Sequence, residues 1–242
     1  MTIASPTRTR PRWRAYLLLS RVSNLPTVWS NVLAGIVASQ AGVSWPDVIR
    51  LSIAVSLLYT AGMFLNDVAD RDSDAVHRRD RPIPAGDVTL RSALTVGLAL
   101  LVAGEIVIAA QPRFLTPLLW SLGLVATIVY YDYRHKRDPL GPLFMGICRG
   151  LVYCVAAAAV ANRVSPSVLA AAAALTAYVV GLTWIAKRLG PSAGFAVPIL
   201  LAGISLVDAA VILVSGGGPA LALTAAAGCP LTLLLQRVVP GT

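Results

Sequence analysis

The sequence predicts an all-α protein, a polytopic bundle of about eight membrane-spanning helices with both termini on the cytoplasmic side. Hydrophobic residues make up 57% of the 242 residues, charged residues make up 13%, and the mean hydropathy is +0.74. These values exceed those of an ordinary soluble domain. Apolar stretches long enough to cross a bilayer recur along the chain, and basic residues gather in alternate connecting segments. The chain is therefore expected to be an integral membrane protein.

Each expected span is a mostly apolar stretch of about 16 to 22 residues, a length that suits a hydrocarbon core of about 30 Å. We expect spans near residues 25–40, 48–65, 89–110, 114–131, 143–162, 166–186, 193–214 and 218–236. Pro26, Pro117 and Pro198 should start or kink helices, because proline lacks the backbone N–H group. We treat residues 1–242 as one transmembrane domain that includes a polar, arginine-rich N-terminal tail over residues 1–15.

The orientation follows from the positions of the basic residues. Of the 20 Lys and Arg residues, only Arg50, Arg113 and Arg163 lie in segments on the non-cytoplasmic side of the predicted bundle. The positive-inside rule then places both termini in the cytoplasm. We expect a bacterial cytoplasmic-membrane protein whose active site faces the cytoplasm and which has no signal peptide. The net charge of +9 is explained by topology and requires no nucleic-acid partner.

An acidic run, residues 66–74, directly follows the second expected span. If the helix continues through it, Asp67, Asp70 and Asp74 share one face, while Asp72 points elsewhere. Three like charges on one face repel one another, and a cation such as Mg²⁺, held by one or two carboxylates and substrate phosphates, would compensate them. The alternative is a solvated acidic cap neutralised by nearby arginines.

The segment that follows the acidic run is basic. Arg78, Arg79 and Arg81 carry forked, permanently charged donors that suit phosphate oxygens. An ordinary positive-inside loop explains them about equally well. His77 is expected to be a surface histidine rather than a ligand.

The motif Asn66-Asp67-x-x-Asp70-x-x-x-Asp74, followed by the loop 81–86 (Arg-Pro-Ile-Pro-Ala-Gly), resembles the signature of the UbiA superfamily of intramembrane prenyltransferases. Members bind an isoprenoid diphosphate through Mg²⁺ held by two aspartate-rich motifs and transfer the prenyl chain to an acceptor. The resemblance implies Mg²⁺ as cofactor, and a prenyl diphosphate and a lipophilic acceptor as substrates in the lipid bilayer. It implies that Asp67, Asp70 and Asp74 are metal ligands and catalytic residues, with Asn66 and Arg81 contacting the substrate.

The next cytoplasmic segment extends the resemblance. Tyr131 and Asp132 are candidate substrate-binding residues, and Lys136 and Arg137 are candidate catalytic cations in the place where family members carry a tyrosine and then a Lys-Arg pair. Arg149 is a candidate for the polar cavity. For these cations the alternatives are a role in topology alone or, for Arg149, snorkelling to the membrane surface. Together with residues 141–150 and 201–208, this segment resembles the EboC-like branch of the superfamily.

The third cytoplasmic segment departs from the family pattern. Typical members place a second aspartate-rich motif at the end of the sixth span, where residues 181–190 of this chain contain no carboxylate. Lys187 and Arg188 lie there instead, and we expect them to contact substrate as an electrostatic substitute for a second metal ion. The family usually has about nine spans, one more than we expect here.

Two acids are expected within the membrane, Glu105 and Asp208. A charge at such depth is costly unless it is protonated, paired or faces a cavity. We favour neutral acids that hydrogen-bond between helices, with an acceptor-side base or a proton relay as the alternative for Asp208.

The sequence thus predicts a membrane prenyltransferase that moves an isoprenoid chain from a prenyl diphosphate to an aromatic or other lipophilic acceptor. A non-catalytic relative that binds or translocates an isoprenoid-like or aromatic metabolite is the second hypothesis, because the second acidic motif is absent. A purely structural membrane subunit ranks third, since it leaves the clustered aspartates unexplained.

Overall fold

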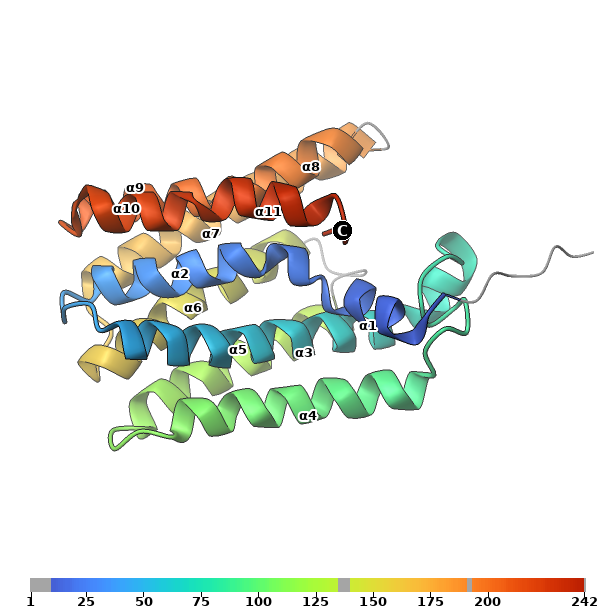
Figure 1. The fold of residues 1–242 in the computed structure, drawn as a ribbon, viewed down its shortest axis with the longest axis horizontal. Coiled ribbons are helices and arrows are strands. Elements are labelled where there is room, and N and C mark those ends of the chain that lie inside the picture. Colours follow the sequence, from blue (N-terminus) through green and yellow to red (C-terminus); the bar gives the residue numbers. More distant parts are fainter. Residues whose placement is uncertain (1–9, 135–139, 191–192, 242) are drawn as a thin grey trace, which may run out of the picture.

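In the computed structural model the protein is a bundle of helices, and residues 10–134, 140–190 and 193–241 are described. Within these ranges there is no β-strand. In chain order the elements are α1 (Arg12–Ser20), the 3-10 helix η1 (Val22–Asn24), α2 (Leu25–Ala38), α3 (Trp45–His77), α4 (Leu90–Ala109), α5 (Leu115–Arg134), α6 (Gly141–Ala161), α7 (Pro166–Leu189), α8 (Ala193–Ala202), α9 (Ile204–Val214), α10 (Gly218–Ala226) and α11 (Gly228–Gln236). The long helices run roughly along one axis (Figure 1).

Seven helical stretches in the described ranges are long and apolar enough to cross a membrane. They are α3 to α7, the pair α8 and α9 (Ala196–Val214), and the pair α10 and α11 (Gly218–Gln236). These stretches confirm the all-α, membrane-spanning class, and they coincide with the second to eighth spans expected from the sequence. The first expected span corresponds to α2, which has only 14 residues.

Helix α2 lies inside the bundle and packs against α3, α6 and α9. Twelve of its fourteen residues are buried. Small residues permit this close packing: a Cβ atom on Gly35 would lie 2.7 Å from the Cα atom of Tyr153 on α6. The neighbouring Ala156 and Ala157 are fully buried. Small residues at such contacts let helix backbones approach closely, as in other membrane proteins.

Proline marks two helix starts and one helix interior. Pro26 lies in the first turn of α2, and Arg21, in the left-handed region with φ of 45°, separates α2 and η1 from α1. Pro117 lies near the start of α5. Pro198 lies inside α8, which ends four residues later.

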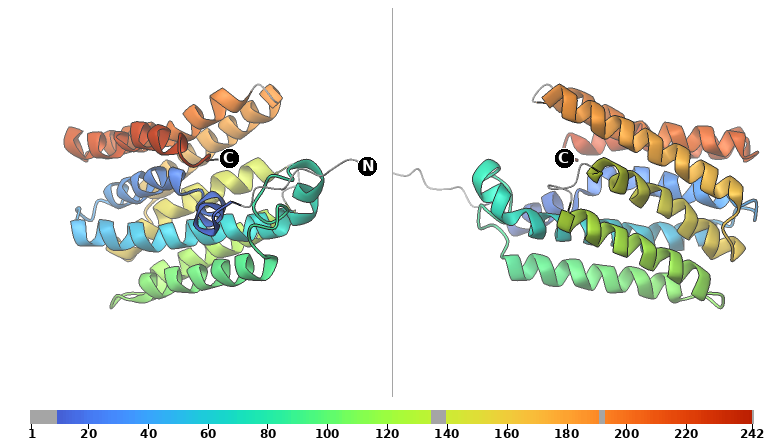
Figure 2. Two further views of the ribbon diagram at one scale, coloured as in Figure 1. Left: turned by 45° about the vertical axis from the view of Figure 1, so that its right-hand side comes forward. Right: turned by 180° about the vertical axis from the view of Figure 1, so that it is seen from behind.

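Helix α3 is much longer than its membrane span. Its 33 residues extend about 50 Å at 1.5 Å per residue, against a hydrocarbon core of about 30 Å. The helix therefore continues through the acidic run to His77. Helix α1 and the end of α11 lie at this same end of the bundle (Figure 2), where Asn24 donates to the carbonyl oxygen of Gly241 at 2.9 Å. Polar segments from distant parts of the chain thus meet at one end.

Candidate active site

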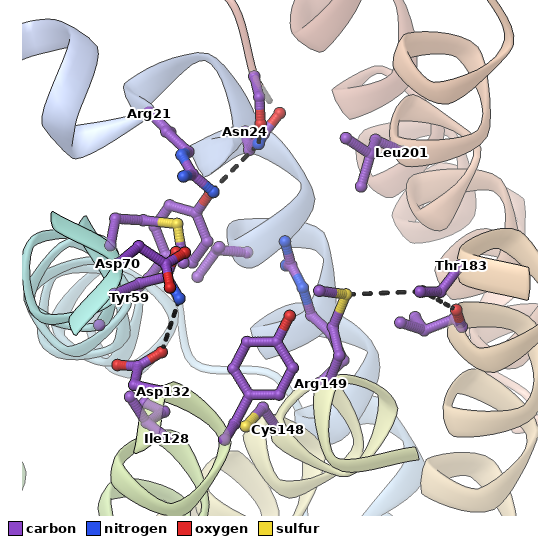
Figure 3. A pocket seen from close by; sticks show the side chains of 18 of the residues that line it. Arg21, Asn24, Tyr59, Asp70, Ile128, Asp132, Cys148, Arg149, Thr183 and Leu201 are labelled. Atoms are coloured by element: carbon purple, nitrogen blue, oxygen red, sulfur yellow. Dashed lines mark hydrogen bonds between the residues drawn. The ribbon is translucent and has the colours of Figure 1, made fainter. Parts of the chain in front are cut away.

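A cavity of about 550 Å³ lies between α3, α5, α6, α7 and the α8–α9 pair (Figure 3). Its lining combines charged and polar side chains with an apolar remainder. The apolar part includes Val55, Leu124, Ile128, Val152, Val179, Leu182, Leu201 and Ile204. An apolar cavity with a few convergent polar groups is the usual form of a small-molecule site.

One face of α3 supplies the polar wall. Tyr59, Asn66, Asp70 and Asp74 line the cavity, and their spacing follows the helical repeat of 3.6 residues. Asp72 instead faces solvent, with 86% of its side chain exposed, and pairs with Arg71. The helix continues as the sequence analysis required, and Asp70 and Asp74 share the face that points into the cavity.

Asp67 lies at the edge of this face and does not line the cavity. Its side chain is only 4% exposed and accepts from Arg21 Nη2 at 3.0 Å and from Arg81 Nη1 at 3.2 Å. At about 100° per residue, Asp67 is turned about 60° away from Asp70, toward the segment that carries Arg21. Asp67 therefore fixes two arginines that themselves line the cavity. Arg81 was expected at the site, whereas Asp67 was expected to bind metal.

The adjoining wall comes from the end of α5. Tyr131 and Asp132, both predicted as substrate-binding residues, line the cavity. Asn66 Nδ2 donates to Asp132 Oδ1 at 3.0 Å, which links α3 directly to α5. The predicted residues Asn66, Asp70, Asp74, Tyr131 and Asp132 are thus brought together.

The side chains present fit a magnesium site whose coordination is completed by substrate. Asp70 and Asp74 present carboxylate oxygens, which Mg²⁺ prefers. Among the residues that the structure describes, no three His, Cys, Asp or Glu side chains converge as a preformed metal cage. This agrees with the usual mode of Mg²⁺ binding, through one or two carboxylates plus substrate phosphates.

The cations predicted after the acidic run divide into two groups. Arg78 and Arg81 line the cavity. Arg79 is exposed and donates from Nε to the carbonyl oxygen of Ala75 at 3.2 Å. His77 also lines the cavity, although it is exposed as expected, and its Nδ1 lies 3.0 Å from the carbonyl oxygen of Ser73.

Lys187 and Arg188 do not line the cavity. The wall from α7 consists of Val179, Leu182, Thr183 and Ala186, which follow one helical face. The next two residues are rotated off this face by about 100° and 200°. Both are exposed, and the Arg188 guanidinium stacks 3.5 Å from the ring centroid of Trp184. The predicted pair Lys136 and Arg137 lies outside the described residues.

Arg149 lies deep in the cavity, as the sequence analysis proposed. Its Nη1 donates to Asn31 Oδ1 at 3.1 Å, and its guanidinium lies 5.4 Å from the ring centroid of Tyr59. The hydroxyl of Tyr59 accepts in turn from Asn24 Nδ2 at 3.2 Å. Arg149 and Tyr59 line the cavity. We call these two residues, with the buried Asn31 that holds Arg149, the floor of the cavity.

Both acids within the membrane hydrogen-bond between helices, as we favoured, while the neutral state that we expected for them stays a prediction. Glu105 on α4 accepts from Ser121 Oγ on α5 at 2.6 Å. Asp208 on α9 is completely buried and accepts from side chains of α2 and α6. Asp208 does not line the cavity, so it cannot contact an acceptor there as a base.

Several polar residues of the site were not predicted from the sequence, among them Arg21, Asn24, Tyr59, Ser73 and Thr183. Tyr59 could have been found, because it lies seven residues before Asn66 on the same helical face. Arg21 and Asn24 precede the first expected span at a spacing that suggests a shared turn. Their basic surroundings had been attributed to topology alone.

Comparison with known proteins adds independent information. The model of the UbiA prenyltransferase family matches residues 25–240. Digeranylgeranylglyceryl phosphate synthase of Methanoculleus marisnigri is 31% identical over 142 residues, which cover 57% of this chain and 49% of that protein. The 4-hydroxybenzoate octaprenyltransferase of Vibrio parahaemolyticus is 29% identical over 145 residues, 59% of this chain and 50% of that protein.

Solved structures agree on the fold. A UbiA homologue from Aeropyrum pernix K1 superposes with a TM-score of 0.57 at 24% identity, over 88% of this chain and 87% of that chain. A digeranylgeranylglyceryl phosphate synthase superposes with a TM-score of 0.59 at 15% identity, over 94% and 98%.

The chain spans about half the length of the first two curated relatives described above. The family model, however, matches most of the chain, and the helical bundle agrees with that of solved family members. The EboC-like branch stays a prediction. The chain belongs to the UbiA prenyltransferase family.

Proposed function

We propose that this protein is a membrane prenyltransferase that moves an isoprenoid chain from a prenyl diphosphate to a lipophilic acceptor, with its polar mouth on the cytoplasmic side. One observation carries the proposal. Asp70 and Asp74 face the same cavity as Arg21, Arg78 and Arg81, and the rest of that cavity is largely apolar. Such a reaction needs metal ligands, cations that bind phosphate, and an apolar cavity for the prenyl chain.

In this proposal Asp70 and Asp74 would hold Mg²⁺, and the bound ion would supply positive charge beside the diphosphate. Asp132 faces them from α5 and is oriented by its hydrogen bond from Asn66. We assign Asp67 a different role from its two neighbours, because two guanidinium groups already occupy its oxygens.

The arginines bind the diphosphate oxygens. Asp67 holds Arg21 and Arg81 side by side, with side chains only 17% and 16% exposed, so both guanidinium groups are fixed before substrate arrives. Guanidinium groups offer paired donors that match phosphate oxygens. Preorganised cations of this kind stabilise charge on a leaving group without reorganising during the reaction.

The apolar residues of the cavity then determine the outcome. The bond between the allylic carbon and the diphosphate oxygen breaks, and both electrons leave with the diphosphate. Side chains such as Leu124, Val179 and Leu201 exclude water from the resulting prenyl cation. An electron-rich acceptor captures the cation and loses its proton to solvent only after the new bond forms, so no general base is required before that step.

Arg149 contacts the acceptor in this proposal. Arg149 lines the cavity and donates to Asn31, whereas Arg21 and Arg81 pair with Asp67. A guanidinium there can donate hydrogen bonds to an oxygen atom of the acceptor and orient it.

A second function has one specific observation in its favour. The described part of the α7 wall contributes Val179, Leu182, Thr183 and Ala186, without any carboxylate. A protein with a single acidic wall could bind an isoprenoid diphosphate or an aromatic metabolite and translocate it without turnover.

Pyrophosphate release distinguishes the two functions. The purified protein in detergent is given Mg²⁺, prenyl diphosphates of graded length and a panel of phenolic acceptors. We expect Mg²⁺-dependent release that Asp70→Asn and Asp74→Asn abolish, while the matched control Asp72→Asn, an exposed acid on the same helix, retains it. No release with any donor, together with retained binding of a labelled prenyl diphosphate, would support the binding function instead.

A further inference from the structure

Asp208 joins three helices behind the floor of the cavity. Its carboxyl group accepts from Ser30 Oγ at 2.5 Å, from Asn31 Nδ2 at 2.9 Å and from Tyr153 Oη at 2.5 Å. Ser30 and Asn31 belong to α2, Tyr153 belongs to α6, and Asp208 itself belongs to α9. All four side chains are buried. A buried polar group with this many partners fixes the orientation of each of them.

The orientation of Asn31 follows from this contact. Both oxygens of Asp208 lie 2.9 Å from Asn31 Nδ2. Both oxygens of Asp208 accept in these contacts, so the NH₂ group of Asn31 faces Asp208. The amide oxygen of Asn31 then faces the other way and accepts from Arg149 Nη1 at 3.1 Å. Asp208 thereby determines that an acceptor, and not a donor, faces Arg149.

The guanidinium of Arg149 has more N–H donors than the described residues use. A guanidinium has five N–H groups, and the hydrogen bond to Asn31 is the one that the structure gives this side chain within residues 10–134, 140–190 and 193–241. The Tyr59 ring supports the guanidinium at 5.4 Å without accepting a conventional hydrogen bond. Arg149 also lines the cavity. Its remaining donors are therefore available to a molecule bound there.

The floor and the phosphate-binding arginines are held by different contacts. Asp67 holds Arg21 and Arg81, whereas Arg149 donates to Asn31, which lies seven residues after Asn24, the last residue of η1. Seven helical residues correspond to about 10 Å, so the backbone anchors of the two groups lie at different depths in the bundle. The floor is therefore a separate polar contact that a group on the second substrate can use.

We propose that Asp208 is a positioning residue for acceptor recognition: through Asn31 it holds Arg149 so that the floor binds an oxyanion, a carboxylate or a phosphate, on the acceptor. The inference rests on the proposed function only where it identifies the bound molecule as the acceptor. Binding of an oxyanion at the floor can be measured without any turnover.

Glu105 provides the matched control. It is also an acid within a membrane-spanning helix, and it also accepts from a serine of a neighbouring helix, Ser121 Oγ at 2.6 Å. Among the residues that the structure describes, Glu105 has no hydrogen-bonded link to the cavity, and it does not line the cavity. A general loss of packing should affect both acids, whereas a loss of positioning should affect Asp208 alone.

The test is isothermal titration of the purified full chain with three probes: 4-hydroxybenzoate, 4-hydroxyphenyl phosphate and the neutral 4-hydroxybenzyl alcohol. In the unaltered protein we expect one of the two anions to bind at least about tenfold more tightly than the alcohol, and the tighter anion identifies carboxylate or phosphate. Arg149→Gln and Asp208→Asn should each remove this preference. The double variant should show no further loss, because both act through one contact. Glu105→Gln should keep the preference.

Three results would overturn the inference. They are an unaltered protein that binds anion and alcohol equally, an Asp208→Asn variant that is less stable but keeps the preference, and single effects that add fully in the double variant. Should Asp208→Asn fail to fold, Asn31→Ala interrupts the same link while Asp208 keeps Ser30 and Tyr153, and it must then lose the preference. A preference that persists in a protein without pyrophosphate release would overturn the proposed function and leave the oxyanion site standing.

Discussion

The α3 wall and the α7 wall of the cavity differ sharply in chemistry. On α3, Asn66, Asp70 and Asp74 face inward, and Asp67 holds two arginines beside them. On α7, the inward face carries Val179, Leu182, Thr183 and Ala186. The charged groups of the described site thus come from α3, α5, α6, the segment before α2 and the loop after α3. In the proposed reaction, this one-sided set must do what two aspartate-rich motifs do in typical relatives.

The largest effect is expected from breaking the acidic wall. Asp70→Asn removes a carboxylate that faces the cavity, and we expect Mg²⁺-dependent pyrophosphate release to fall by about 10²- to 10³-fold, the usual cost of losing one group that stabilises developing charge. Initial rates at saturating donor check this. Asp72→Asn, with its exposed side chain, serves as the control, and an equal loss in both variants would mean that the helix as a whole, not the cavity face, had been damaged.

Asp67→Asn should distinguish positioning from metal binding. The variant weakens the hold on Arg21 and Arg81, and hydrogen bonds to charged groups of this kind correspond to about 10- to 100-fold in affinity. We expect a higher KM for the prenyl diphosphate with an unchanged Mg²⁺ concentration for half-maximal rate. A shifted Mg²⁺ requirement with an unchanged KM would instead assign Asp67 to the metal.

Adding a carboxylate to the neutral wall sharpens the comparison. Ala186 lines the cavity from α7, so Ala186→Asp places an oxygen ligand opposite the acidic wall. Because Mg²⁺ affinity rises with ligand charge, we expect half-maximal rate at an Mg²⁺ concentration about two- to tenfold lower. Ala186→Asn supplies the same volume without the charge. A gain in both variants would point to a change in packing.

The smallest effect is expected from the cations at the end of α7. Lys187→Ala and Arg188→Ala alter exposed side chains outside the cavity, and exposed charges contribute little. We expect less than about a threefold change in pyrophosphate release for either. A loss as large as that of Asp70→Asn would restore these residues as a substitute for the second acidic motif.

Much of the fold could be predicted from the sequence, because hydropathy indicates the membrane spans and the positions of the basic residues indicate their orientation. The expected span 48–65 corresponds to part of α3, and the expected span 218–236 corresponds to the whole α10–α11 pair. The full extent of α3 could not be predicted in the same way. Its last turns lie beyond the apolar stretch, where hydropathy carries no information.

Part of the cavity lining could be predicted. Asp70 and Asp74 were expected on one face from residue type and helical spacing, and Tyr131 and Asp132 were expected from the resemblance to the UbiA superfamily; all four line the cavity. The partnership of Asp67 with Arg21 and Arg81 depends on how α1 and η1 fold back onto α3. No local pattern records this arrangement. The same is true of Asp208, whose link to Arg149 runs through Asn31, far away in the sequence.

One measurement tests the central claim directly: an experimental structure of the protein with Mn²⁺ in place of Mg²⁺ and a non-reactive prenyl thiodiphosphate. The account predicts the metal between Asp70 and Asp74, the diphosphate oxygens beside Arg21 and Arg81, and the prenyl chain along the apolar part of the cavity. Diphosphate bound instead at Lys187 and Arg188, with Asp70 and Asp74 free of metal, would contradict it.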